Sequence, residues 1–139
     1  MHLGVAIPLP DDLLVAPALF DAEQLEVDGL AEARRVLTGK ALAGKLSVKE
    51  LTGATVTVSN LGLSRVHYFT PILNVPQVAI VGIGSSQQRL QRAADGSLVE
   101  RDFLGLSLTF DHRAVNGAPA ADFLDALCRR IESGEGADS

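Results

Sequence analysis

The sequence contains little cysteine, few aromatic residues and no concentrated positive charge. Its single cysteine, Cys128, cannot form an internal disulfide bond, and the absence of tryptophan leaves the core mainly to aliphatic side chains. There is no apolar stretch of about 18 residues and no cleavable signal peptide, so we expect a cytoplasmic protein that does not enter a membrane. The net charge of −5, without any run of lysine or arginine, argues against DNA or RNA as the main partner.

Patterns typical of metal, phosphate and nucleophilic-serine sites are also missing. The histidines His2, His67 and His112 are scattered, and no histidine, cysteine and acidic residues have metal-ligand spacing. Segment 82–86 lacks the third glycine of a dinucleotide-binding fingerprint and the Gly-Lys-Ser/Thr of a P-loop. Ser59 does not stand in the Gly-x-Ser-x-Gly setting of a nucleophile elbow. We therefore expect neither a metal ion nor a phosphate cradle.

The size and apolar content of the chain are those of one packed domain. A chain of 139 residues buries roughly 70% of its unfolded surface when it folds. Apolar residues make up 47% of the sequence and the mean hydropathy is +0.22, which is high for a soluble domain of this size. Part of the apolar surface is therefore expected to face another subunit.

The hydrophobic pattern alternates between strand-like and helix-like segments. Period-two alternation or a short apolar run predicts a strand, and apolar residues three and four positions apart predict a helix. Asp95-Gly96 marks a hairpin turn, and Gly44 is typical of the residue that ends a helix. These signals predict two strands or a hairpin over 3–8 and 13–19, a helix over 28–43, and a turn or short helix at 46–51. They also predict strands over 55–60, 78–83, 98–99 and 104–110, and a final helix carrying Ala120, Phe123, Leu124, Leu127 and Ile131.

His112 lies between the strand over 104–110 and the final helix, a position where α/β enzymes place catalytic groups. The backbone holds it on both sides, which suits a general base. Two interpretations are open from the residues alone: a base, or a structural histidine that caps the turn. Asn116 is a natural N-cap for the helix, and Pro119 falls within its first turn, where a missing amide costs little.

Ser59 and Cys128 each have a structural and a chemical interpretation. Ser59 ends the strand over 55–60, so its hydroxyl either points into a cleft or bonds nearby backbone in a turn. Cys128 falls near the apolar face of the final helix, which favours packing over a nucleophilic role.

Several segments together resemble the catalytic domain of the dihydrolipoyl acyltransferases, the E2 components of 2-oxoacid dehydrogenase complexes, within the chloramphenicol acetyltransferase-like superfamily. Each segment alone is a weak signal, but their order and spacing are similar to those of the family. The segments are the strand pair from Leu3 to Pro17, the helix exit around Ala43–Gly53, the strand Thr55-Val56-Thr57-Val58-Ser59-Asn60-Leu61-Gly62, the proline-containing segment Phe69–Ile80, and Asp111-His112-Arg113-Ala114-Val115-Asn116-Gly117-Ala118, which is similar to the family's His-Arg-x-x-Asp-Gly signature.

The resemblance implies a fold and a reaction. The fold would be of the α/β (α+β) class, with a mixed β-sheet and helices packed on one side. An acyl group would move between a dihydrolipoyl thioester and coenzyme A, with His112 as the base for the coenzyme A thiol and Ser59 as a hydrogen-bond donor to the oxyanion. Asn116 would complete the catalytic set, supported by Asp111, Arg113 and Gly117, and no metal would take part.

The chain departs from the family pattern in two ways. Asn116 replaces the aspartate of the signature; it cannot form an ion pair with arginine, but it can still cap the helix and orient the loop. The family's catalytic domain is longer, so we expect residues 1–132 to be the C-terminal part of an N-terminally truncated domain and residues 133–139 to be a flexible tail. The lipoyl group would then arrive on another domain or chain.

The family resemblance also implies an assembly. We expect a homotrimer in which Ser59 and His112 meet between neighbouring subunits, and partners that include lipoyl domains and other complex components. Two alternatives remain: a non-catalytic trimeric scaffold or remnant, and a related acyl transfer in which His112 activates a hydroxyl group, as in chloramphenicol acetyltransferase relatives.

Overall fold

A mixed β-sheet forms the centre of the computed structural model, which describes residues 1–134. Within this part of the chain the sheet has five strands in the order β4-β1-β5-β6-β7. Strands β1, β5 and β6 are parallel, and the outer strands β4 and β7 are antiparallel to their neighbours. The strands are β1 (Leu3–Val5), β4 (Ala18–Leu19), β5 (Val56–Asn60), β6 (Ala79–Arg92) and β7 (Leu98–Phe110).

The N-terminal hairpin is present, but it is interrupted. Its outer part pairs β2 (Ile7–Pro8) with β3 (Leu14–Val15) as a separate two-stranded sheet. Its inner part pairs β1 with β4 inside the main sheet. Asp11 and Asp12 form the turn with φ values of 60° and 58°, a left-handed conformation that aspartate tolerates better than most residues.

The predicted helices form close to the expected boundaries. Helix α1 (Val27–Leu42) buries Leu37 and Ala41, and Gly44 follows it at φ +66°. After it, α2 (Val48–Thr52) begins with a capping box in which Ser47 and Glu50 exchange hydrogen bonds. The remaining elements are the 3₁₀ turn η1 (Ala22–Gln24) and helix α3 (Gly117–Ser133).

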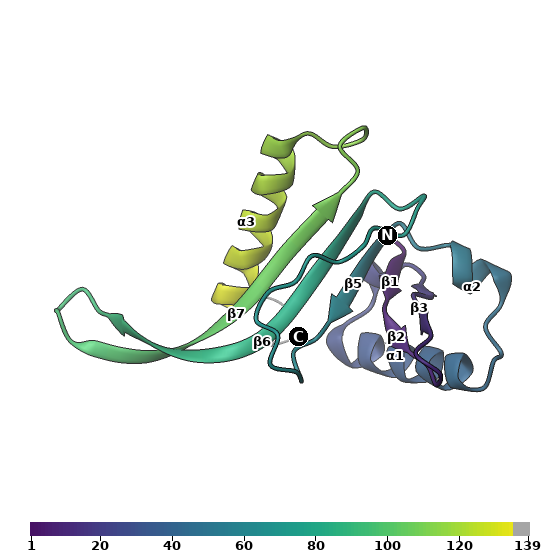
Figure 1. Cartoon of the computed structure of the whole chain (residues 1–139), viewed down its shortest axis with the longest axis horizontal. Coiled ribbons are helices and arrows are strands. Elements are labelled where there is room, and N and C mark those ends of the chain that lie inside the picture. The colour runs from purple at the N-terminus through teal and green to yellow at the C-terminus, as the bar shows by residue number, and fades with distance from the viewer. Residues whose placement is uncertain (135–139) are drawn as a thin grey trace.

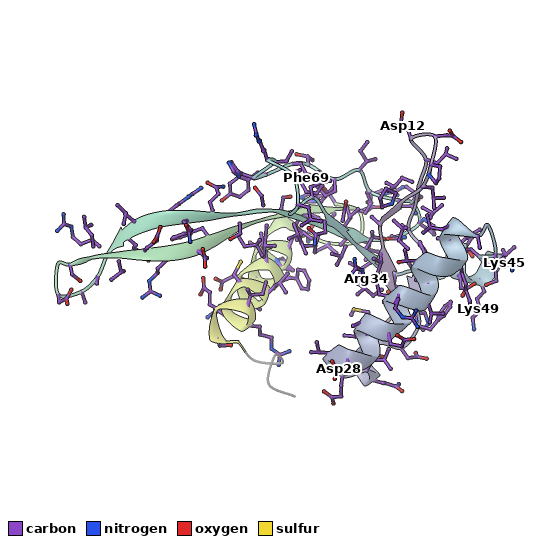
Figure 2. The ribbon with its side chains drawn as sticks, turned by 90° about the horizontal axis from the view of Figure 1, so that it is seen from below. Asp12, Asp28, Arg34, Lys45, Lys49 and Phe69 are labelled. Carbon is purple, nitrogen blue, oxygen red and sulfur yellow. The ribbon has the colours of Figure 1, made fainter. Side chains whose placement is uncertain are left out.

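The two long helices lie on the same side of the sheet, and a long connection lies on the other. Figure 2 shows α1 and α3 below the strands, with Phe69 on the opposite side. Phe69 belongs to segment 61–78, which joins β5 to β6 and which we call the crossing loop. The predicted mixed sheet with helices on one side is therefore confirmed.

The β6–β7 hairpin is longer than the sequence pattern predicts. Strand β6 continues past the apolar run to Arg92, and β7 is one continuous strand rather than two segments. Asp95-Gly96 forms the turn as expected, with Gly96 at φ +86°. The hairpin extends beyond the rest of the molecule, and α3 packs across the inner end of β7 (Figure 1).

The C-terminal boundary differs from the expected one by one residue. Ser133, expected in the tail, is the last residue of α3, and Gly134 follows as its C-cap at φ 70°. The rest of the expected tail, residues 135–139, lies outside the described residues. Among the helices of residues 1–134, none is long and apolar enough to cross a membrane.

Candidate active site

His112 lies in the turn between β7 and α3 and is exposed in the single chain. The backbone N–H of Asp111 donates to the carbonyl of Val78, at the start of β6, and thereby fixes the beginning of the turn against the sheet. The ring of His112 lies 5.7 Å, centroid to centroid, from that of Phe110. The imidazole is therefore positioned by one aromatic neighbour and by the turn that carries it.

An ion pair closes the turn around His112. The Arg113 guanidinium donates to both carboxylate oxygens of Asp111, with Nη2 2.6 Å from Oδ2, and the backbone N–H of Arg113 also donates to Asp111. These hydrogen bonds lower the pKa of Asp111 to about 2, because each of them favours the charged carboxylate. Asp111 and Arg113 thus hold the residues on either side of His112 together.

Asn116 occupies the predicted N-cap position of α3 without a capping hydrogen bond from its side chain. Its carbonyl accepts from Ala120, which begins the helix. Gly117 follows with open space where a Cβ would stand. The contacts within one chain thus leave the Asn116 amide free to point toward a substrate or a neighbouring subunit.

Ser59 lies near the end of β5 and faces the crossing loop. It is level with Gly82 of β6, which is level with Ser107 of β7, so all three residues point to the same side of the sheet. The Ser107 hydroxyl donates to the Phe69 carbonyl at 2.5 Å, which identifies that side as the one beneath the crossing loop. The Ser59 side chain is partly exposed.

Three strand glycines allow the crossing loop to approach the sheet. A Cβ on Gly84 or Gly105 would lie well inside 3.0 Å of the His67 carbonyl oxygen, and a Cβ on Gly82 would meet the Phe69 ring at 3.0 Å. The sequence interpretation tested Gly82 and Gly84 only as parts of a phosphate cradle. Glycine inside a strand is also a signal for close backbone approach, and this signal could have located the crossing loop.

His67 anchors the same loop through its side chain. Its Nδ1 lies 2.8 Å from the hydroxyl of Ser85, a residue only 6% exposed. Further along, Thr57 donates to Gln77 at 2.5 Å, and both side chains are buried. These hydrogen bonds hold the crossing loop to the sheet at His67 and at Gln77. Ser59 lies just before the loop begins.

Ser59 and His112 do not meet within one chain. Ser107 is level with Ser59, whereas Asp111 lies four residues further along the chain, just past the end of β7, about 13 Å away at the usual rise of a strand. Crossing from β5 to β7 adds two strand spacings, about 10 Å. The His112 ring also lies against Phe110 on the α3 face, and Ser59 faces the crossing loop. A site containing both residues therefore requires a second copy of the chain.

A groove of about 750 Å³ lies between α1 and the strands. Its lining is mainly aliphatic, and Arg34 supplies its cation. Figure 2 shows Arg34 on the inner side of α1, toward the sheet. Within residues 1–134, no three histidine, cysteine or acidic side chains are grouped so that they could hold a metal ion.

The chain matches the family described as 2-oxoacid dehydrogenases acyltransferase (catalytic domain) over residues 1–137. It belongs to this family. Among relatives, it is 42% identical over 132 residues to the dihydrolipoyllysine-residue acetyltransferase component of the acetoin cleaving system of Bacillus subtilis, and 38% identical over 137 residues to that of the pyruvate dehydrogenase complex of Mycobacterium bovis. These alignments cover 95% and 96% of this chain.

Solved structures of this acyltransferase family have the same fold. The dihydrolipoamide acetyltransferase of Azotobacter vinelandii superposes with a TM-score of 0.87 at 34% identity, over 94% of this chain and 53% of that one. The cubic core of a pyruvate dehydrogenase multienzyme complex gives a TM-score of 0.84 at 36% identity. The chain thus spans about half of these solved structures, and 33% and 25% of the two curated relatives.

Several apolar side chains are exposed in this chain, which covers only part of the acyltransferase domain. On α3, Ala120 is buried, but Phe123 and Ile131 are each 49% exposed. On the facing strand, Leu106, Leu108 and Phe110 are only half-buried, although they alternate as a core face should. These apolar residues of the helix and of the strand are therefore only partly covered within this chain.

Proposed function

We propose that this chain carries the acyl-transfer residues of an E2 component, moving an acyl group between coenzyme A and a dihydrolipoyl group. The observation that carries the proposal is the spacing of three residues, which is close to that in a related enzyme. In the A. vinelandii enzyme, the residues investigated for a role in the catalytic mechanism are a serine, a histidine 52 positions later and an asparagine four positions after that. Here Ser59, His112 and Asn116 are separated by 53 and four positions.

His112 acts as the general base in the proposed reaction. Its imidazole takes the proton of the coenzyme A thiol, and the thiolate attacks the carbonyl carbon of the S-acyl-dihydrolipoyl group, forming a new C–S bond. A thiol with an ordinary pKa near 8.5 is acidic enough for an imidazole to deprotonate it without a metal. The exposed position of His112 gives a thiol direct access to the ring.

Ser59 stabilises the oxyanion that forms next. As the carbonyl electron pair moves onto oxygen, the Ser59 hydroxyl donates a hydrogen bond to it. Collapse of the intermediate breaks the C–S bond to the dihydrolipoyl sulfur, which receives the proton from His112. Removal of one such donor lowers kcat by about 10² to 10³-fold. Asn116, four residues after His112 at the N-cap of α3, has no capping hydrogen bond from its side chain, and its amide orients the thiol or the imidazole.

The assembly proposed here is a homotrimer whose active sites lie between subunits. The separation of Ser59 from His112 along and across the sheet supports this arrangement, and the exposed apolar faces provide surface for it. A cyclic assembly repeats one heterologous contact, so each serine meets the histidine of the next copy. Lipoyl domains and the other complex components would be further partners.

The direct test measures transfer with the full chain. Acetyl-CoA and dihydrolipoamide are incubated with the protein, and S-acetyl-dihydrolipoamide is measured by liquid chromatography and mass spectrometry. His112→Ala is expected to abolish transfer, whereas the matched control His2→Ala, just before β1, keeps it. An inactive wild-type chain that still forms trimers would refute the acyltransferase proposal and favour the scaffold function.

Mixing two inactive variants tests the interface site. In trimers assembled at random from equal amounts of Ser59→Ala and His112→Ala chains, a site is intact when it takes serine from one variant and histidine from the other. About a quarter of wild-type activity should then return. If the site formed within one chain, the mixture would stay as inactive as its components.

A further inference from the structure

Phe69 is the apolar side chain beside Ser59. Ser59 and Gly82 are level on adjacent strands, and a Cβ on Gly82 would lie 3.0 Å from Cζ and 3.2 Å from Cε1 of the Phe69 ring. The edge of the ring therefore rests on the Gly82 backbone. Because adjacent strands are about 4.8 Å apart, the ring stands next to the Ser59 side chain on the β6 side.

The backbone of the crossing loop holds this ring in place. The Phe69 carbonyl accepts a hydrogen bond of 2.5 Å from Ser107, directly across Gly82. Two residues earlier, the His67 carbonyl lies against Gly84 and Gly105, where no side chain separates it from the strands. These contacts fix the backbone that carries Phe69 against the strands, and the ring packs on Gly82.

The Phe69 ring would therefore bound, on the β6 side, any group held at the Ser59 hydroxyl. An acyl thioester whose carbonyl oxygen is bound at Ser59 has two substituents on its carbonyl carbon. The sulfur carries a long arm that must reach solvent, whether it belongs to coenzyme A or to a dihydrolipoyl group. Only the acyl group is short enough to end against a closed wall.

We propose that Phe69 determines which acyl groups the chain transfers, by forming the end wall of an acyl subsite beside Ser59. This inference rests on the proposed acyltransferase function and deepens it. With the phenylalanine ring in place, the subsite takes acetyl groups and disfavours branched ones. Shortening the side chain at position 69 lengthens the subsite on its β6 side and admits larger acyl groups.

The test compares acyl groups on the full chain and two variants. Initial rates with acetyl-CoA, propionyl-CoA and isobutyryl-CoA, at fixed dihydrolipoamide, give kcat/KM for each donor. In wild type, acetyl-CoA is the preferred donor. Phe69→Ala is expected to raise the isobutyryl-to-acetyl ratio of kcat/KM by about tenfold or more, since each methylene in an apolar pocket changes discrimination about 10 to 200-fold. Ile72→Ala, in the same loop but at a side chain 90% exposed, leaves that ratio unchanged.

A second variant guards against loss of the loop structure. Phe69→Leu keeps an apolar side chain over Gly82 and should raise the propionyl-to-acetyl ratio, with a thermal melt close to that of wild type. Unchanged ratios in Phe69→Leu, with acetyl transfer retained, would overturn the role of Phe69 and leave the proposed function intact. Absence of transfer from every donor in wild type would instead overturn the proposed function, and this inference with it.

Discussion

The side of the sheet that carries Ser59 and the turn that carries His112 are built in different ways. Ser59 lies within a strand, at the edge of a crossing loop whose backbone touches Gly84 and Gly105. His112 lies outside the strands, in a turn held mainly by the Asp111–Arg113 pair and followed by open space at Gly117. Contacts within one chain thus fix the strands and the loop around the serine more tightly than they fix the turn that carries the histidine.

This difference indicates which contacts fix the position of each residue. Backbone packed against glycine leaves no room for adjustment, so the serine side is rigid and intolerant of substitution. The histidine turn is expected to tolerate change better, because it has fewer contacts within its own chain. Four substitutions measure this contrast in the free energy of unfolding or the melting temperature.

Gly84→Ala should have the largest effect. The added Cβ would overlap the His67 carbonyl, a backbone atom that cannot rotate away, so strand and loop must separate. We expect a loss of about 3 kcal/mol or more, at or above the upper end for overpacking. Urea unfolding followed by circular dichroism measures it. A midpoint equal to that of wild type would show that the serine side is not rigid.

Ser107→Ala should have a smaller effect on the same side. It removes the hydrogen bond to the Phe69 carbonyl and leaves that partly buried acceptor without this donor. The expected loss is about 1 kcal/mol, measured by the same urea titration. Ser97→Ala, in the exposed β6–β7 turn, is the matched control for loss of a serine hydroxyl in general. Equal losses in the two variants would contradict the loop-anchoring role of Ser107.

Gly117→Ala should be neutral or stabilising, in contrast to Gly84→Ala. No atom lies within 4 Å of the added Cβ, and the backbone is not in the left-handed region. A gain of about 0.5 kcal/mol is expected from the lower entropy of the unfolded chain. The melting temperature, measured at a low protein concentration so that contacts between copies do not contribute, is the readout. A large loss there would mean that the histidine turn is as tightly packed as the serine side.

Asp111→Asn should have the smallest effect, confined to pH values above the acid range. The pKa of Asp111 is lowered from 3.8 to about 2 by hydrogen bonds from Arg113, so its stabilising contribution is complete above 3.8 and disappears as the pH falls through about 2. The Arg113 side chain is 85% exposed, and solvent therefore weakens the pair. Melting temperatures of wild type and variant should differ slightly at pH 5 to 7 and converge near pH 2. A difference that grows on acidification would contradict this assignment.

Much of the fold was predictable because it depends on local pattern. Apolar spacing located α1 to within one residue at each end, and Gly44 ended that helix for the reason that glycine usually does. The outer part of β6 was missed because Gln88 to Arg92 are exposed on both faces. Such a segment has no alternation of buried and exposed residues. It is a strand only because it pairs with β7.

The candidate site was only partly predictable for a related reason. The residue types and order of Ser59, His112 and Asn116 follow from the sequence motifs. The roles of Phe69, Ser107 and the strand glycines depend on contacts between segments that are distant along the chain. The hydrogen bond from the Ser107 hydroxyl to the Phe69 carbonyl, for example, joins residues 38 positions apart. Loop closure over such a distance leaves no periodic trace in the sequence.

The sequence by itself determined the kinds and order of the elements, the helix ends and the family motif around His112, because each depends on neighbours within a few positions. The tertiary structure alone decided that Ser59 lies beneath a crossing loop, beside Phe69, and that His112 lies beyond its reach in the same chain. Strand register caused both results: pairing along β5, β6 and β7 sets which residues are level, and local sequence does not encode that alignment.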